Sequence, residues 1–359
     1  MRKLLKVVLL VMPVVMLVSH YGMFIFQSKS TFAGQLKIAF ASSLTGPGQE
    51  GAQEMLRAVQ VYANDANTIG GVDELKVEII PFDDTNDPDK ARAVAEKISS
   101  DQSIVAVIGH NYSSASIAAG PVYARAGIPA ITPSSTHPDV TRNNPWYFRT
   151  IFSDTSQGDF LAQYARDGLN GHAVGVLASD DLYARNIASS FCTAAGLAGL
   201  EINGTWWVEP KTPGFEAAID KAVAGLKALP EDAIILLATH FAPAVTIVRK
   251  LRDAGIKNRI LGPDSLGATG FTKAFSGFAK DQARPGFYTN GIYVAVPFMT
   301  DTGNREARRL IERLEADHGP LKNWGAPYAY DAVKLIVTAA HRAQLRSNGL
   351  AGADARKAV

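Results

Sequence analysis

The sequence predicts an α/β fold of two doubly wound parallel-sheet lobes joined by a hinge, with a hydrophobic helix at the N-terminus. From residue 36 onward, short and almost continuously apolar runs alternate with amphipathic stretches. This alternation is typical of parallel strands that are covered by helices on both faces. It occurs in two successive series of four units, which indicates two similar lobes. The 359 residues, of which 47% are hydrophobic, are sufficient for two separate cores.

The expected strands alternate with helices in both series. The strands are residues 36–41, 75–82, 104–108 and 129–132 in the first series, and 173–177, 204–208, 233–238 and 259–261 in the second. The helices are residues 51–67, 88–100, 113–126, 156–169, 183–197, 215–226 and 242–254. Asp87 before Pro88 supports one helix start, because aspartate caps free N–H groups and proline is favoured in the first turn.

The pattern changes after Phe287, and this change predicts the domain organisation. A strand is expected over residues 288–296, followed by helices over 300–316 and 326–345. The predicted first lobe comprises residues 35–154 plus about 297–345, and the second lobe comprises 155–296. Residues 346–359 are expected to be the start of an incomplete C-terminal segment.

The first 34 residues predict export from the cytoplasm. Arg2, Lys3 and Lys6 precede a long apolar run, as in the charged and hydrophobic regions of a signal peptide. A second apolar run follows, so that residues 4–26 are long enough to span a bilayer as a retained signal anchor. Both alternatives stay open, and both place the remainder of the chain in the periplasm or on the extracellular face.

Composition and motifs argue against several function classes. The 36 basic and 34 acidic residues nearly balance, and no basic run is interleaved with aromatic residues, so no nucleic-acid partner is expected. Cys192 is the single cysteine, which excludes an intrachain disulfide. The sequence has no G-x-S-x-G, P-loop or H-E-x-x-H motif, so no catalysis, cofactor or metal site is expected. Asp83, Asp84 and Asp87 are interpreted as capping and solvated groups.

Ligand chemistry is expected beyond the carboxyl ends of the parallel strands, where loops enter helices. After strand 104–108, a loop of small and polar residues leads into a helix at Ser113, whose hydroxyl and neighbouring N–H groups suit a carboxylate. After strand 129–132, Ser134 and Thr136 can add carbonyl and hydroxyl contacts to the same ligand. The alternatives are an ordinary serine N-cap and a simple turn.

The second series offers a complementary set of side chains. The ring of Tyr183 can form one wall of the ligand site. His240 follows strand 233–238 and is expected to act as a polar or stacking group. Asp264 follows strand 259–261 and can pair with a ligand ammonium in a desolvated site. The alternatives are a partly buried tyrosine at a helix start and a surface turn aspartate. A zwitterion that bridges both series would favour a closed arrangement of the two lobes.

Several ordered segments in these loops resemble a known family. They are residues 38–47 (IAFASSLTGP), 82–88 (FDDTNDP), 107–114 (VIGHNYSS), 127–133 (GIPAITP) and 261–264 (LGPD). The ordered set resembles the leucine/isoleucine/valine-binding family of periplasmic solute receptors, which has the type I periplasmic-binding fold. The resemblance covers about residues 36–345 and implies a similar fold and a binding role.

The resemblance implies roles for the polar residues at the strand ends. Ser113 and the loop over residues 134–136 would hold the ligand carboxylate, and Thr136 would also contact the amino group. Asp264 falls where family members place an acidic partner for the ammonium, and Tyr183 falls where they place a tyrosine. These implied roles agree with the ligand contacts inferred above from the residue types in the loops.

Three further positions would lie beside the ligand side chain and depart from the family pattern. His240 falls where an aromatic residue often lines the pocket, and Asn111 and Tyr112 would flank the side-chain end of the ligand. Tyr112 is one of the residues that replace a cysteine pair of some members, and the region around Gly51 lacks an aromatic residue that some carry. The predicted pocket is therefore more polar than a simple leucine site.

The predicted function is that of an extracytoplasmic solute-binding protein, which captures an amino acid or related small polar molecule between two lobes for an ABC-type importer. The expected partners are the small-molecule ligand and the membrane subunits of the transporter. The alternative is a membrane-anchored ligand-sensing domain of a larger receptor or signalling protein, which a retained helix over residues 4–26 would favour.

Overall fold

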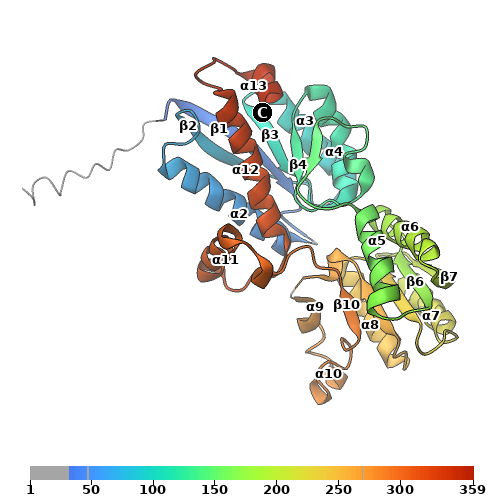
Figure 1. Cartoon of the computed structure of the whole chain (residues 1–359). Helices are drawn as coiled ribbons and strands as arrows, with labels where there is room; N and C mark the ends of the chain where they lie inside the picture. The colour runs from blue at the N-terminus through green and yellow to red at the C-terminus, as the bar shows by residue number, and fades with distance from the viewer. Residues whose placement is uncertain (1–31, 47, 269) are drawn as a thin grey trace, which may run out of the picture.

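The described part of the chain folds into two lobes, each built on a parallel sheet (Figure 1). The computed structural model describes residues 32–46, 48–268 and 270–359, so all but the last three residues of the leader or anchor predicted over residues 1–34 lie outside the described residues. Sheet A consists of β1 (Gly34–Ser42), β2 (Leu75–Asp83), β3 (Ile104–Gly109), β4 (Ala130–Thr132) and β5 (Tyr147–Arg149). Sheet B consists of β6 (Ala173–Ser179), β7 (Glu201–Val208), β8 (Ile234–Ala238), β9 (Arg259–Gly262) and β10 (Ile292–Val294).

The two sheets have the same topology. Sheet A has the order β2-β1-β3-β4-β5, and sheet B, taken from its β7 edge, has the order β7-β6-β8-β9-β10. In both sheets the second strand therefore lies beside the first, and the third lies on the other side of the first. All pairings within the two sheets are parallel. The prediction of two similar doubly wound lobes is confirmed.

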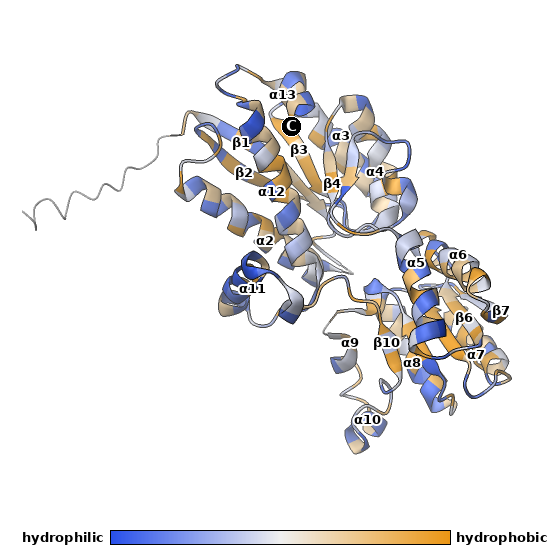
Figure 2. Cartoon of the chain, in the orientation of Figure 1, coloured by the Kyte–Doolittle hydropathy of each residue, from blue (hydrophilic) through white to orange (hydrophobic). Residues whose placement is uncertain are grey.

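Helices connect the strands and cover both sheets. The helices of the first series are α2 (Gln49–Thr68), α3 (Pro88–Ser100) and α4 (Ser113–Ala126). Those of the second are α5 (Asp154–Gln163), α6 (Leu182–Leu197), α7 (Phe215–Leu226), α8 (Phe241–Asp253), α9 (Gly270–Lys273) and α10 (Ala279–Ala283). The C-terminal helices are α11 (Arg305–His318), α12 (Gly325–Ala343) and α13 (Gly352–Ala358). In Figure 2 the strands are mostly orange, whereas α11 is mostly blue, as expected for a helix with a large solvated face.

Most predicted elements are confirmed, and the differences lie where turns interrupt an apolar run. The strand expected over residues 288–296 is only Ile292–Val294, because turns precede it and both Gly286 and Gly291 have positive φ angles. The helix expected from residue 300 begins at Arg305, where the Asn304 side chain accepts a hydrogen bond from the first turn. The short strand β5 and the helices α9 and α10 were not predicted, whereas α13 lies within the C-terminal segment expected over residues 346–359.

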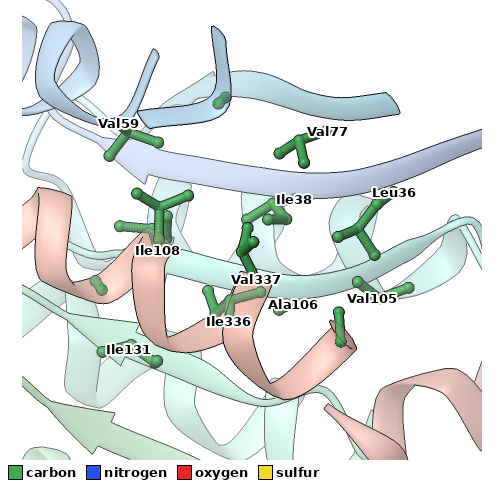
Figure 3. Close-up of a cluster of buried hydrophobic side chains, with 14 of the residues drawn as sticks. Leu36, Ile38, Val59, Val77, Val105, Ala106, Ile108, Ile131, Ile336 and Val337 are labelled. Atoms are coloured by element: carbon green, nitrogen blue, oxygen red, sulfur yellow. The ribbon is translucent and has the colours of Figure 1, made fainter. Parts of the chain in front are cut away.

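The C-terminal helices pack on the first lobe, although they follow the second lobe in the chain. Ile336 and Val337 of α12 share a buried cluster with Leu36 and Ile38 of β1 and with Ile108 of β3 (Figure 3). In Figure 1 the red helices α12 and α13 accordingly lie beside the blue strands of sheet A. The chain therefore passes between the lobes after β5 and again after β10. The residue boundaries of the predicted lobes stay a prediction.

A buried arginine joins α13 to sheet A. The side chain of Arg356 is 2% exposed, and its guanidinium donates to the carbonyl oxygens of Ile104 at 2.9 Å, Asp101 at 2.7 Å and Ser99 at 3.2 Å. We expect Arg356→Met to lower the free energy of unfolding by about 2 kcal/mol, because it leaves buried carbonyl groups without donors. Urea denaturation would measure the change. The control is Lys357→Met at an exposed neighbouring position, and equal stabilities of the two variants would contradict this prediction.

Candidate functional site

The first-lobe part of the candidate site lies where β3 and β4 lead into their loops. Ser113 is the first residue of α4, is 5% exposed, and its Oγ accepts a hydrogen bond from the His137 N–H at 3.2 Å. No side chain caps the N-terminus of α4. Thr136, in the loop after β4, is 1% exposed. The start of α4 therefore retains N–H groups that can bind an anion next to two buried hydroxyl groups.

Asn111 and Ser134 lie in contact, and the Ser134 hydroxyl is hydrogen-bonded to Asn111 rather than free for a ligand. The Ser134 hydroxyl lies 2.8 Å from the carbonyl oxygen of Asn111 and 2.7 Å from its side-chain Oδ1. This contact joins the loops after β3 and β4. It engages the Ser134 side chain within the protein, so that its carbonyl group is the part left for a ligand.

The second-lobe part of the site is centred on Asp264. This residue is 4% exposed, so the alternative of a surface turn aspartate is wrong. Its Oδ1 accepts hydrogen bonds from the Tyr183 hydroxyl at 2.7 Å and from Gln157 Nε2 at 2.9 Å. Trp324 Nε1 donates to the Asp264 carbonyl oxygen at 3.0 Å. Burial raises the pKa of Asp264, and the hydrogen bonds from Tyr183 and Gln157 act in the opposite direction.

Asp154 links the two parts of the site. It is the first residue of α5, and its N–H donates to the Thr136 carbonyl oxygen at 2.9 Å. Its side chain is fully buried, and neither carboxylate oxygen has a normal hydrogen bond to another described residue. The pKa of Asp154 is raised to about 8, chiefly by burial, and the negative charge of Asp264 contributes to this rise. The nearby Thr136 hydroxyl and the Arg149 charge lower this pKa without cancelling the effect of burial.

We call Ser113, Thr136, Asp154 and Asp264 the interlobe site. The backbone of Asp154 is hydrogen-bonded to Thr136 at 2.9 Å, and the Asp154 carboxyl group interacts electrostatically with that of Asp264. Arg149 does not neutralise the two acids, because its guanidinium donates to the carbonyl oxygens of Thr136 at 2.8 Å and His137 at 2.9 Å. The interlobe site therefore combines two buried carboxyl groups with the start of α4.

Three aromatic side chains border the interlobe site. Tyr183, in the first turn of α6, is 6% exposed and stacks on His240 with the ring centroids 4.8 Å apart. His240 also contacts Tyr112 of the first lobe at a centroid distance of 5.4 Å. His240 Nε2 lies 3.8 Å from an oxygen of Asp181. All three residues were predicted from the sequence, and the structure brings them together.

A second buried network supports the loop that carries Ser113. His110 Nδ1 lies 2.6 Å from Asp84 Oδ2, and His110 Nε2 lies 2.9 Å from the Tyr123 hydroxyl. Asp84 is 1% exposed, so its interpretation as a solvated group is wrong. The capping interpretation is confirmed for Asp87, whose side chain accepts from the first N–H groups of α3. The network ties the ends of β2 and β3 to α4 and thereby positions the loop.

Asp154, Gln157 and Trp324 were not predicted as site residues. Asp154 was placed at the end of the first-lobe segment, and the helix after it was expected to begin at residue 156, two residues after its actual start. A Ser-Asp pair before an amphipathic run is a helix-start signal and could have identified the true start. Trp324 reaches Asp264 from a distant part of the chain, and its local sequence contains no signal for that contact.

Two surface hollows lie away from the interlobe site. One, of about 550 Å3, is lined by residues of α7, α8 and α10, including Asp220, Arg249 and Phe278. The other, of about 540 Å3, lies between α2 and α12 and includes Tyr62 and Tyr330. None of the eight predicted site residues lines either hollow.

Two similar lobes with a buried polar site where they meet are the architecture of bilobal ligand-binding proteins. The chain belongs to the periplasmic binding protein family, because the family model described as "Periplasmic binding protein" matches residues 35–359. The resemblance seen in the sequence is thereby confirmed.

Curated relatives and solved structures agree with this assignment. The leucine-, isoleucine-, valine-, threonine- and alanine-binding protein of Pseudomonas aeruginosa is 29% identical over 89% of this chain and 81% of its own length. The Leu/Ile/Val-binding protein of Escherichia coli K12 is 32% identical over 67% of this chain and 64% of its own length. The branched-chain amino acid transporter substrate-binding protein of Streptococcus pneumoniae, solved with isoleucine, has a TM-score of 0.75 at 24% identity, covering 90% of this chain and 86% of that chain.

The same fold also occurs with other ligands. A solute-binding protein of an ABC transporter from Rhodopseudomonas palustris, solved with benzoate, has a TM-score of 0.75 at 17% identity, covering 90% of this chain and 85% of that chain. Fold similarity therefore does not identify the ligand. Among the described residues, no helix has the length and apolarity needed to cross a membrane.

Proposed function

We propose that this chain is an exported solute-binding protein that holds an amino acid between its lobes and delivers it to an ABC-type importer without chemical change. The observation that carries the proposal is the pair of buried carboxyl groups of Asp154 and Asp264 at the lobe interface. Buried carboxylates are costly unless a positive charge or hydrogen bonds compensate them. A ligand ammonium would supply that compensation.

The opposite part of the site suits an anion. The start of α4 presents N–H groups beside the Ser113 hydroxyl, and the helix dipole favours a negative charge there. An α-amino acid carries an ammonium and a carboxylate on one carbon atom, so it matches both parts of the interlobe site. Because the two parts belong to different lobes, such a ligand binds most tightly when the lobes are closed.

The named relatives support the transport role. The curated relatives are amino-acid-binding proteins, and the solved relatives are substrate-binding or solute-binding proteins of transporters. On this basis we propose the periplasm or extracellular face as the location and the transporter membrane subunits as partners. The ligand contacts proposed for Asn111, Tyr112, Ser113, Ser134, Thr136, Tyr183, His240 and Asp264 are part of the same proposal.

A thermal-shift screen with matched ligand sets tests this function. We expect several α-amino acids to raise the melting temperature, because a ligand that binds only the folded state stabilises it. The corresponding carboxylic acids without the amino group, the corresponding amines without the carboxyl group, and benzoate should have little effect. Equal stabilisation by the acids that lack an amino group would contradict the proposed role of Asp154 and Asp264.

A second measurement separates binding from catalysis. The stabilising amino acid is incubated with the protein and then examined by NMR. We expect it to be recovered unchanged, whereas time-dependent conversion that requires the folded protein would show an enzyme.

A further inference from the structure

Three aromatic rings form a row across the lobe interface, and we call Tyr112, His240 and Tyr183 the aromatic row. The rings of Tyr112 and His240 are at 66° with centroids 5.4 Å apart, and those of His240 and Tyr183 are at 24° with centroids 4.8 Å apart. Aromatic rings at these separations are in direct contact. Tyr112 belongs to the first lobe and His240 to the second, so their contact joins the lobes.

The backbone of the first lobe supports Tyr112 from behind. Gly48, which precedes α2, has a φ angle of 87°, a left-handed conformation that favours glycine. A Cβ atom at Gly48 would collide with the Tyr112 hydroxyl, so the end of the tyrosine ring packs directly against this glycine. The ring therefore cannot move back toward α2 without displacing the backbone.

The aromatic row begins and ends at the groups proposed to hold the ligand. Tyr112 directly precedes Ser113, and Tyr183 donates its hydroxyl proton to Asp264 at 2.7 Å. An amino acid that bridges Ser113 and Asp264 therefore has this row along one flank. On another flank, Gln157 and Trp324 are hydrogen-bonded to Asp264.

We propose that Tyr112 limits the size of the ligand side chain, so that the site selects small amino acids such as alanine, serine and threonine over leucine and phenylalanine. This inference rests on the proposed function and specifies the class of ligand. A carbon atom inserted between the Tyr112 and His240 rings needs about 3.5–4 Å to each ring, whereas their centroids are 5.4 Å apart. A bulky side chain that enters here holds the lobes apart and loses the stabilisation that closure provides.

Calorimetric titration of alanine, serine, leucine and phenylalanine into the wild type, Tyr112→Ala and Tyr112→Phe tests the proposal. We expect the wild type to bind alanine at least tenfold more tightly than leucine. Tyr112→Ala should change the leucine-to-alanine affinity ratio at least tenfold in favour of leucine, and Tyr112→Phe should retain the wild-type ratio because it retains the ring. Tyr293→Ala is the control, since Tyr293 is an aromatic residue of β10 that is 37% exposed.

The outcomes separate this inference from the proposed function. Leucine binding to the wild type as tightly as alanine, or an unchanged ratio in Tyr112→Ala, would overturn the size limit and leave the amino-acid-binding function intact. Failure of the wild type to bind any of these amino acids or others in the thermal-shift screen would overturn both. If Tyr112→Ala melts far below the wild type, Tyr112→Leu is used in its place. We then expect a smaller change of the leucine-to-alanine affinity ratio in the same direction.

Discussion

Replacing Asp264 by asparagine is expected to weaken amino-acid binding by about 2 kcal/mol or more, which is roughly a thirtyfold loss of affinity. The substitution retains the shape of the side chain but removes the negative charge that would pair with the ligand ammonium. Tyr183 and Gln157 both donate to Oδ1, so the amide oxygen can still accept these hydrogen bonds. Calorimetric titration with the amino acid that gives the largest thermal shift measures the change.

The stability of the ligand-free variant distinguishes a binding role from a structural role. Burial raises the pKa of Asp264, which means that its ionised form is costly in the empty protein. The ligand-free Asp264→Asn protein should therefore be at least as stable as the wild type while its affinity is much lower. Asp220→Asn, an exposed change on α7 of the same lobe, is the matched control and should leave the affinity unchanged. Wild-type affinity in Asp264→Asn would refute the ammonium contact.

The fold could be predicted from the sequence because its signals are local. A central strand of a doubly wound sheet is buried on both faces, so it appears as a continuous apolar run such as residues 104–108. The bounds of α3, α4 and α7 were predicted as observed. Strand β5 has only three residues, and Phe148 within it is half exposed. A strand this short and this exposed has no distinct pattern.

The candidate site could be predicted only where its residues directly follow strands. Tyr183, His240 and Asp264 are all at or just after strand ends of the second series, and the topology brings these ends to one edge of the sheet. The burial of Asp264 results from contacts with residues that are distant in the chain, namely Gln157, Tyr183 and Trp324, and no local pattern encodes such contacts. The same reason explains Asp84, whose burial depends on His110.

Asp154 is expected to make the stability of the ligand-free protein depend on pH. In the folded protein burial raises the pKa of Asp154 to about 8, whereas an unfolded aspartate has a pKa of about 3.9. Between these values the folded state holds a proton that the unfolded state has released, so the free energy of unfolding falls as the pH rises. The slope from this one group is at most about 1.4 kcal/mol per pH unit.

Comparing Asp154→Asn with the wild type isolates this effect from all other titrating groups. The asparagine variant cannot ionise at this position, so its advantage in the free energy of unfolding should grow from about pH 5 to about pH 8. Urea denaturation of both ligand-free proteins across this range measures the difference. Asp159→Asn, an exposed change on the same helix, should show no such trend. A difference that stays constant across the range would show that Asp154 ionises normally in the folded protein.

Ligand binding should reverse the protonation of Asp154. An ammonium placed beside the carboxyl group favours its ionised form, so binding near pH 7 should release a proton. Calorimetric titrations in buffers of different ionisation enthalpy would detect the release as a buffer-dependent binding enthalpy. Asp154→Asn should abolish that dependence and also weaken binding, because only one charged carboxyl group would remain for the ammonium. Proton release of the same size in wild type and variant would assign the titrating group to another residue of the site.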